Sequence, residues 1–140
     1  MDLENVFHDL RAHDEPVPRH RQLPSESEVA KCERLLGINF HADFRRYLLE
    51  ASDINCGMLE PVTIDRADSH THLLKIAHKA WENYGVPREL LPICMYNADF
   101  YCMNSIGQVV YWSHNGWAST VWPSLADWIQ QVWLADPELL

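Results

Sequence analysis

Residues 90–117 read LLPICMYNADFYCMNSIGQVVYWSHNGW and contain three short β runs in succession. The runs cover residues 91–94, 100–103 and 109–112, and the second is rich in the aromatic residues that strands favour. Gly107, in the turn before the last run, can adopt the positive φ that tight hairpins need. Connections this short join antiparallel strands, because a parallel crossover takes a dozen residues or more. The stretch therefore predicts an antiparallel meander.

Amphipathic helices are predicted ahead of this meander. Ser25 and Glu28 form a capping box, in which the two side chains satisfy free backbone amides of the first helical turn. The helix that they open ends at Gly37. Apolar side chains at helical spacing predict two more helices, over residues 42–51 and 71–84.

Two weaker strand patterns and a final helix accompany these elements. Residues 59–64 are a candidate edge strand because a proline lies inside them, and residues 117–122 are a candidate further strand after the meander. Ser124 caps a last amphipathic helix. Strands grouped in the middle with helices on either side predict an α+β fold, in which helices flank a central antiparallel sheet.

The first 22 residues are predicted to lie outside the main domain. Residues 2–11 carry apolar side chains at helical spacing, and residues 12–22 contain prolines and charged side chains, as exposed connectors do. We therefore predict an N-terminal helix and connector over residues 1–22 and a single α+β domain over residues 23–140. A chain of 140 residues is long enough to close one core.

The charge of the chain limits its partners. Lys and Arg number 11 against 20 Asp and Glu, and the net charge of −9 disfavours direct binding of nucleic acid and favours a basic partner. The same charge also serves solubility. The sequence shows neither an apolar run long enough to span a membrane nor a signal-peptide pattern, so we expect a cytoplasmic protein. It has no Gly-rich phosphate loop, and we expect no cofactor.

Four short motifs of the meander resemble those of the SUKH superfamily. They are Ala98-Asp99, Phe100-Tyr101, the turn at residues 104–107, and Tyr111-Trp112. Ala98 stands where the family usually has glycine. Upstream the resemblance rests on Leu23-Pro24, Glu28, Leu36-Gly37, Phe44, Tyr47 and Leu48, with His41-Ala42 in place of a family proline, so that it covers roughly residues 23–134.

The SUKH superfamily joins a fungal cell-wall regulator with bacterial immunity proteins. The resemblance implies an α+β fold and a non-enzymatic, protein-binding role, most often that of an immunity protein that neutralises a toxin of the same or a neighbouring cell. Many such toxins act on nucleic acid and are basic, which suits an acidic partner. The alternative is a cytoplasmic regulatory adaptor of the same fold with no toxin partner.

Catalysis is a remote alternative. The four cysteines show no disulfide framework, and we predict that they are reduced and buried: Cys32, Cys56, Cys94 and Cys102. A small cysteine hydrolase would need Cys102 held against His114, with Asp99 to orient the imidazole. A cysteine in the middle of a strand packs more often than it reacts, and no nucleophile elbow is present.

A metal site is not expected. His70 and His72 would place two imidazoles on one side of an extended segment, but two ligands do not make a site, and no third ligand lies at a recognised zinc spacing. We expect the segment His70-Thr71-His72 to mark a helix N-terminus capped by Asp68 or Ser69.

The predicted partner-binding residues gather around the meander. Trp112 and Trp117 flank a polar turn, where rigid aromatic rings suit a protein interface, although packing in the core is the alternative for both. Strand alternation places Tyr101 and Phe100 on opposite faces of the sheet without deciding which face is exposed. The predicted set is Asp99, Tyr101, Trp112, His114 and Trp117, with Glu60, Asp65 and Asp68 adding negative potential nearby.

Overall fold

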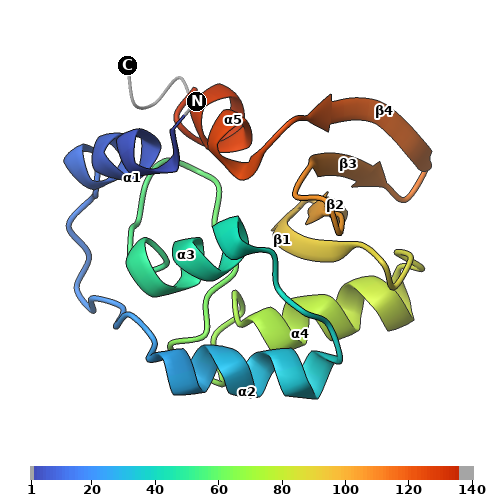
Figure 1. Cartoon of the computed structure of the whole chain (residues 1–140), viewed down its shortest axis with the longest axis horizontal. Coiled ribbons are helices and arrows are strands. Elements are labelled where there is room, and N and C mark those ends of the chain that lie inside the picture. Colours follow the sequence, from blue (N-terminus) through green and yellow to red (C-terminus); the bar gives the residue numbers. More distant parts are fainter. Residues whose placement is uncertain (1, 136–140) are drawn as a thin grey trace.

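A four-stranded antiparallel sheet lies on one side of the molecule, and helices occupy the other side and run beneath it (Figure 1). The structure, a computed structural model, describes residues 2–135, and for residues 116–119 it describes the backbone alone. The strands are β1 (Leu91–Tyr96), β2 (Asp99–Met103), β3 (Val109–Ser113) and β4 (Gly116–Trp122), and they lie side by side in sequence order. The predicted meander, the further strand and the α+β fold are confirmed.

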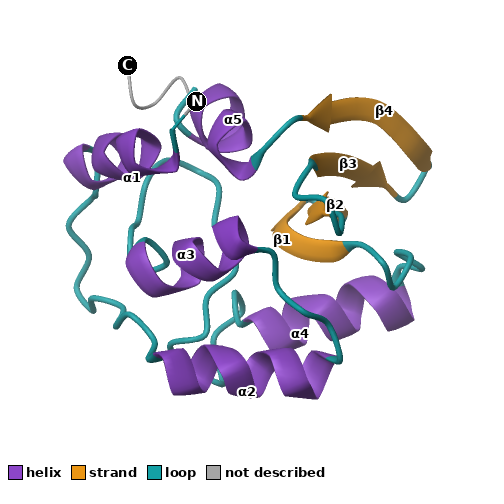
Figure 2. Ribbon diagram, in the orientation of Figure 1, coloured by secondary structure: helices purple, strands orange, loops and turns teal. Residues whose placement is uncertain are grey.

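Five α-helices are described in residues 2–135, and Figure 2 shows how they separate from the strands. They are α1 (Leu3–Ala12), α2 (Glu26–Leu36), α3 (Ala42–Glu50), α4 (Leu73–His78) and α5 (Leu125–Trp128). The last two continue as π-helical segments, Lys79–Asn83 and Ile129–Trp133. None of these helices has the length and apolar character that crossing a membrane requires.

The helix ends test the predicted caps. The Ser25–Glu28 capping box is present, and Gly37 ends α2 in the left-handed conformation at φ 68°. The predicted cap of α4 was wrong: α4 begins at Leu73, and His72 is its N-cap, with Nδ1 accepting from the Leu74 amide at 3.1 Å. The Ser69 hydroxyl instead pairs with Thr71.

The predicted edge strand at residues 59–64 was also wrong. The segment makes two isolated bridges, between Pro61 and Cys94 and between Thr63 and His72. It cannot extend one ladder because its donors turn to different partners: the amide of Val62 donates to β1, whereas the amide of Thr63 donates to Thr71. The segment therefore joins β1 to the start of α4 through these two hydrogen bonds.

The two faces of the sheet are covered unequally. Phe100 and Cys102 are fully buried, and the Phe100 ring contacts Tyr84, just after the π-helical segment that continues α4. Tyr101, on the opposite face, is half-buried and contacts Trp128 of α5 at a ring-centroid distance of 5.2 Å. The face that carries Tyr101 is thus the partly open one.

The two-residue turn between β1 and β2 is unusual in composition. Asn97 and Ala98 both have positive φ, 49° and 69°, as the tightest hairpin turns require. Asn tolerates this conformation, but a left-handed residue with a Cβ costs about 1–2 kcal/mol. Ala98 therefore holds a strained conformation at the position where the family usually has glycine.

Helix α1 packs into the same core as the sheet and the other helices. Leu3, Val6, Phe7 and Leu10 are all buried in it, and α1 contacts α5. The connector is tied down as well, because the backbone of Glu15 donates to Asn55 at 2.7 Å. This packing favours a domain that includes α1 over the boundary predicted at residue 23, and deletion of residues 1–22 tests that boundary.

Candidate partner-binding surface

Five side chains form a continuous surface at the open end of the sheet. Asp99 and Tyr101 lie on the same face of β2. Asp99 pairs with Tyr96 on β1, and Tyr101 pairs with Tyr111 on β3. His114 follows β3 and reaches the same place. We call these five residues, Tyr96, Asp99, Tyr101, Tyr111 and His114, the tyrosine face.

Asp99 is the fixed centre of this surface. Its carboxylate accepts hydrogen bonds from the Tyr111 hydroxyl, from the His114 amide at 3.3 Å and from His114 Nδ1 at 2.9 Å. Burial alone would raise the pKa of Asp99, but these hydrogen bonds outweigh it and the pKa is lowered. The same contact raises the pKa of Tyr111 to about 12. At neutral pH the surface therefore carries an ionised carboxylate beside a neutral phenol.

His114 offers a free ring nitrogen to a partner. Its Nδ1 faces Asp99, and the side chain is 51% exposed. When the neutral ring carries its proton on Nδ1, Nε2 is an acceptor that points away from the carboxylate. A lysine, arginine or amide of a partner could donate to it.

Aromatic rings supply the apolar part of the surface. The ring of Tyr101 lies 5.3 Å from that of Tyr111 and 5.7 Å from that of Trp122, measured between centroids. Tyr96 is 41% exposed at the edge. Tyrosine and tryptophan dominate the energetics of many protein interfaces because they bury much area with few rotatable bonds.

The two predicted tryptophans differ from the rest of the predicted set. Trp112 is only 8% exposed and its ring packs against Phe100, on the face opposite Tyr101. The structure therefore shows Trp112 packed in the core, which was the alternative to a place in an interface. Trp117 pairs with Trp112 across β3 and β4, but its side chain lies outside the described residues.

The cysteine–histidine arrangement that the remote hydrolase alternative would need does not form. Asp99 does contact His114, but Cys102 pairs with Val110 on the other face of the sheet and is fully buried. Burial raises the pKa of the Cys102 thiol far above its usual value. Cys102 therefore has neither the access nor the thiolate character of a nucleophile at His114.

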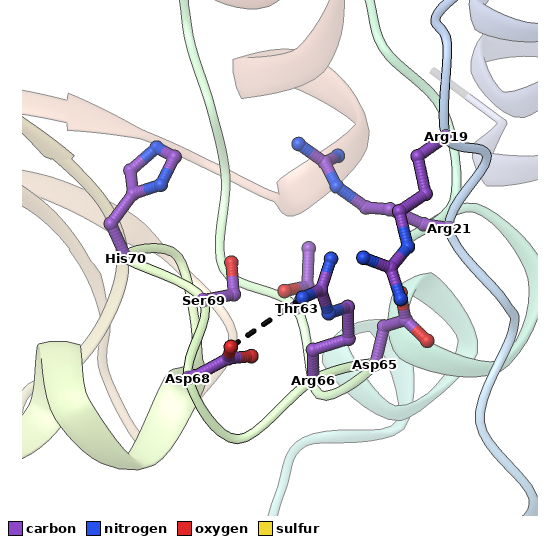
Figure 3. Close-up of a pocket in the computed structure, with 8 residues that line it drawn as sticks. All are labelled: Arg19, Arg21, Thr63, Asp65, Arg66, Asp68, Ser69 and His70. Carbon is purple, nitrogen blue, oxygen red and sulfur yellow. Dashed lines mark hydrogen bonds and ion pairs between the residues drawn. The ribbon is translucent and has the colours of Figure 1, made fainter.

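The other three predicted residues lie elsewhere, on the loop before α4. Asp65 and Asp68 line a pocket together with Arg19, Arg21 and Arg66, as Figure 3 shows. The connector brings two arginines onto this loop, so positive charges lie beside the predicted acidic residues, and their part in partner binding stays a prediction. These arginines were missed, since more than 40 residues separate them from Asp65 in the sequence.

The two histidines of the loop face different groups. His70 Nε2 lies 2.7 Å from the carboxylate of Glu60, the third acidic residue predicted here. His72 caps α4 instead. Among residues 2–135, no three His, Cys, Asp or Glu side chains come together as metal ligands would.

Comparison with known proteins identifies the fold family. The sequence pattern of the family SUKH_5, described as SMI1-KNR4 cell-wall, matches residues 3–134. The chain belongs to the SUKH family. A crystal structure of a protein from Pseudomonas syringae pv. tomato is similar to this SUKH chain, with a TM-score of 0.89 and 41% sequence identity over 94% of this chain and 98% of that one. No protein with a curated description matches it.

The family match confirms the resemblance seen in the meander and extends it. It begins at residue 3, so the SUKH pattern includes α1 as well as the helices and strands that follow. Residues 23–134, on which the resemblance was based, are only part of the region that matches.

Proposed function

We propose that this SUKH protein is a non-enzymatic binding module of the immunity type, which captures a basic toxin domain on its tyrosine face. The observation that carries the proposal is the Asp99 carboxylate, which Tyr111 and His114 hold ionised among half-buried aromatic rings. A fixed carboxylate with aromatic neighbours suits a partner's lysine or arginine, because little rotamer entropy is lost on binding.

The charge distribution supports a basic partner. No lysine or arginine follows Arg88 in the sequence, so the four strands and α5 contribute none to the surface around Asp99. The whole chain carries a net charge of −9. A nuclease-type toxin is basic because it binds nucleic acid, and the opposite charges accelerate encounter. The proposal places the protein in the cytoplasm, where such a toxin meets nucleic acid.

Co-expression tests the proposal directly. The protein is produced together with the C-terminal domain of a secreted-toxin-like protein encoded beside its gene, and cell survival and co-purification are scored. We expect rescue of growth and a stable complex. A neighbouring toxin domain that still kills the cells and does not co-purify would contradict the immunity role.

Two variants locate the binding surface. Tyr96→Ala removes an exposed ring of the tyrosine face and should weaken the complex at least tenfold, as loss of an interface anchor does. Ile106→Ala is the matched control, because Ile106 is an exposed apolar residue in the turn at the other end of β2. An equal loss of affinity in both variants, or no loss in either, would show that the partner binds outside the tyrosine face.

The adaptor role is the second candidate. It has the same surface and fold but a cellular protein as partner. A pull-down that captures one host protein, loses it in Tyr96→Ala and retains it in Ile106→Ala would favour this role over the toxin.

A further inference from the structure

A polar pocket of about 440 Å³ lies between the N-terminal connector and the loop before α4. Arg19 and Arg21 enter it from the connector, and Arg66 enters from the loop. Figure 3 shows the three side chains extending toward the space between the two segments. None of these residues belongs to the tyrosine face.

The three guanidinium groups are only partly engaged by the protein. Arg66 pairs with Asp68 at 3.4 Å, and both of these side chains are exposed. Arg21 donates to the carbonyl of Ile54 through one nitrogen at 3.4 Å. Within residues 2–135, Arg19 makes no hydrogen bond or ion pair. Most of the donors that face this pocket are therefore available to a ligand.

This concentration of cations opposes the overall charge of the molecule. The chain has a net charge of −9, yet three of its 11 Lys and Arg residues line one pocket, where they outnumber the carboxylates of Asp65 and Asp68. Arginine presents its donors in a planar fork that matches the oxygens of phosphate and carboxylate groups. The excess of guanidinium groups over carboxylates attracts an anion of this kind to the pocket.

The remaining wall of the pocket accepts hydrogen bonds. Asp65 lines it and has no ion pair or hydrogen bond within the described part of the chain. The Ser69 hydroxyl lines it as well, but it is already bonded to the amide and the hydroxyl of Thr71. A bare anion leaves the Asp65 carboxylate unused, whereas a ligand that carries hydroxyl groups beside its anionic group would donate to it.

We propose that this pocket binds a small phosphate monoester that carries hydroxyl groups, of the size of a sugar phosphate. The arginines bind the phosphate oxygens, and the Asp65 carboxylate binds the hydroxyls. The volume is within the range of small-molecule sites in proteins. The proposal is independent of the partner that the tyrosine face binds.

Calorimetric titration of the full chain tests this site with three probes: ribose 5-phosphate, inorganic phosphate and ribose. We expect saturable binding of ribose 5-phosphate, weaker binding of inorganic phosphate and no binding of ribose. Affinity should fall as salt is added, because the ligand is charged. Absence of saturable binding of ribose 5-phosphate, or equal affinity for inorganic phosphate, would overturn the proposal.

Matched arginine variants locate the ligand. Arg19→Gln should weaken ribose 5-phosphate binding at least tenfold while the thermal unfolding midpoint is unchanged, because Arg19 bonds to no described residue. Arg34→Gln, at an exposed position on α2, is the control and should bind as the unaltered chain does. Unchanged binding in Arg19→Gln, or an equal loss in Arg34→Gln, would refute the site.

Discussion

The guanidinium of Arg11 donates a hydrogen bond of 2.8 Å to the carboxylate of Asp53, which lies 42 residues further along the chain. A second nitrogen of Arg11 donates to the carbonyl of Glu50 at 2.9 Å, so one side chain joins α1 to the end of α3. Asp53 is 9% exposed, and its other oxygen has no partner in residues 2–135. Arg11 is therefore the main compensation for a buried negative charge.

Replacing Arg11 should destabilise the fold. Arg11→Met keeps much of the side-chain volume but leaves the Asp53 carboxylate without its donor, and we expect a loss of about 2 kcal/mol in the free energy of unfolding. Urea denaturation measures the change. Arg34→Met, at an exposed arginine that bonds to no described residue, should change it by less than about 0.5 kcal/mol. A similar effect in both variants would contradict this account.

Deletion of residues 1–22 tests the predicted domain boundary. The deletion removes Leu3, Val6, Phe7 and Leu10 from the common core, and each buried apolar side chain contributes roughly 1.5–3 kcal/mol. Since domains are stable by only about 5–15 kcal/mol, we expect the fragment to be largely unfolded or to lose most of its stability. Thermal unfolding followed by circular dichroism measures this. A fragment with an unchanged cooperative transition would instead support a domain that begins at residue 23.

The stability contributed by Asp99 should disappear in acid. Its pKa is lower in the folded protein than its ordinary value, so the unfolded chain binds a proton more readily. The contribution is present above that ordinary value and is lost as the pH falls through the folded one. The stability difference between the unaltered chain and Asp99→Asn should therefore shrink from pH 5 to pH 2.

Chemical denaturation at several pH values measures this difference. Glu89→Gln, at an exposed carboxylate with no hydrogen bond to any described residue, gives the background. If the Asp99→Asn difference stays constant over this range, the bonds from Tyr111 and His114 do not stabilise the charged form.

Ala98→Gly should stabilise the protein. Glycine removes the strain of the left-handed conformation at φ 69°, and the greater freedom of glycine in the unfolded chain offsets part of the gain. We expect a net increase of about 0.5 kcal/mol in the free energy of unfolding. Ala42→Gly, in the first turn of α3, should have the opposite sign because glycine disfavours a helix. A decrease in Ala98→Gly would show that the Ala98 methyl group makes contacts worth more than the strain.

Gly107→Ala should cost more than Gly37→Ala. Both positions have positive φ, but a Cβ at Gly107 would lie 2.6 Å from His41 Nε2, whereas a Cβ at Gly37 meets nothing within 4 Å. His41 cannot move freely because its Nδ1 accepts from the Asp43 amide at the start of α3. We expect losses of about 1 kcal/mol at Gly37 and about 2–3 kcal/mol at Gly107 in thermal unfolding. Equal losses would show that the His41 ring moves aside without cost.

Local sequence determines most of the sheet and the helices, and this is why they could be predicted. The turn at Gly107 and the capping box at Ser25 are interactions between residues a few positions apart. The start of α4 was missed because His72 is an uncommon N-cap, and the 59–64 segment was missed because its partners are Ile93 and Thr71. Such pairings depend on the tertiary arrangement.

Part of the arrangement at the candidate site could also be predicted. Asp99 and His114 were singled out from residue types in the meander, and the structure brings them together. The contribution of Tyr111 was missed because strand register, which the sequence leaves open, sets its distance to Asp99. The arginine pocket was missed because Arg19 lies in a connector that looks like a boundary in the sequence.

The absence of lysine and arginine after Arg88 has a practical consequence for proteolysis. Trypsin cuts only after these residues, so every tryptic site lies in α1 to α4 or in the segments around them, and residues 89–140 contain none. Limited trypsinolysis of this protein therefore reports on opening of the helical half, and a different protease is needed to see the sheet.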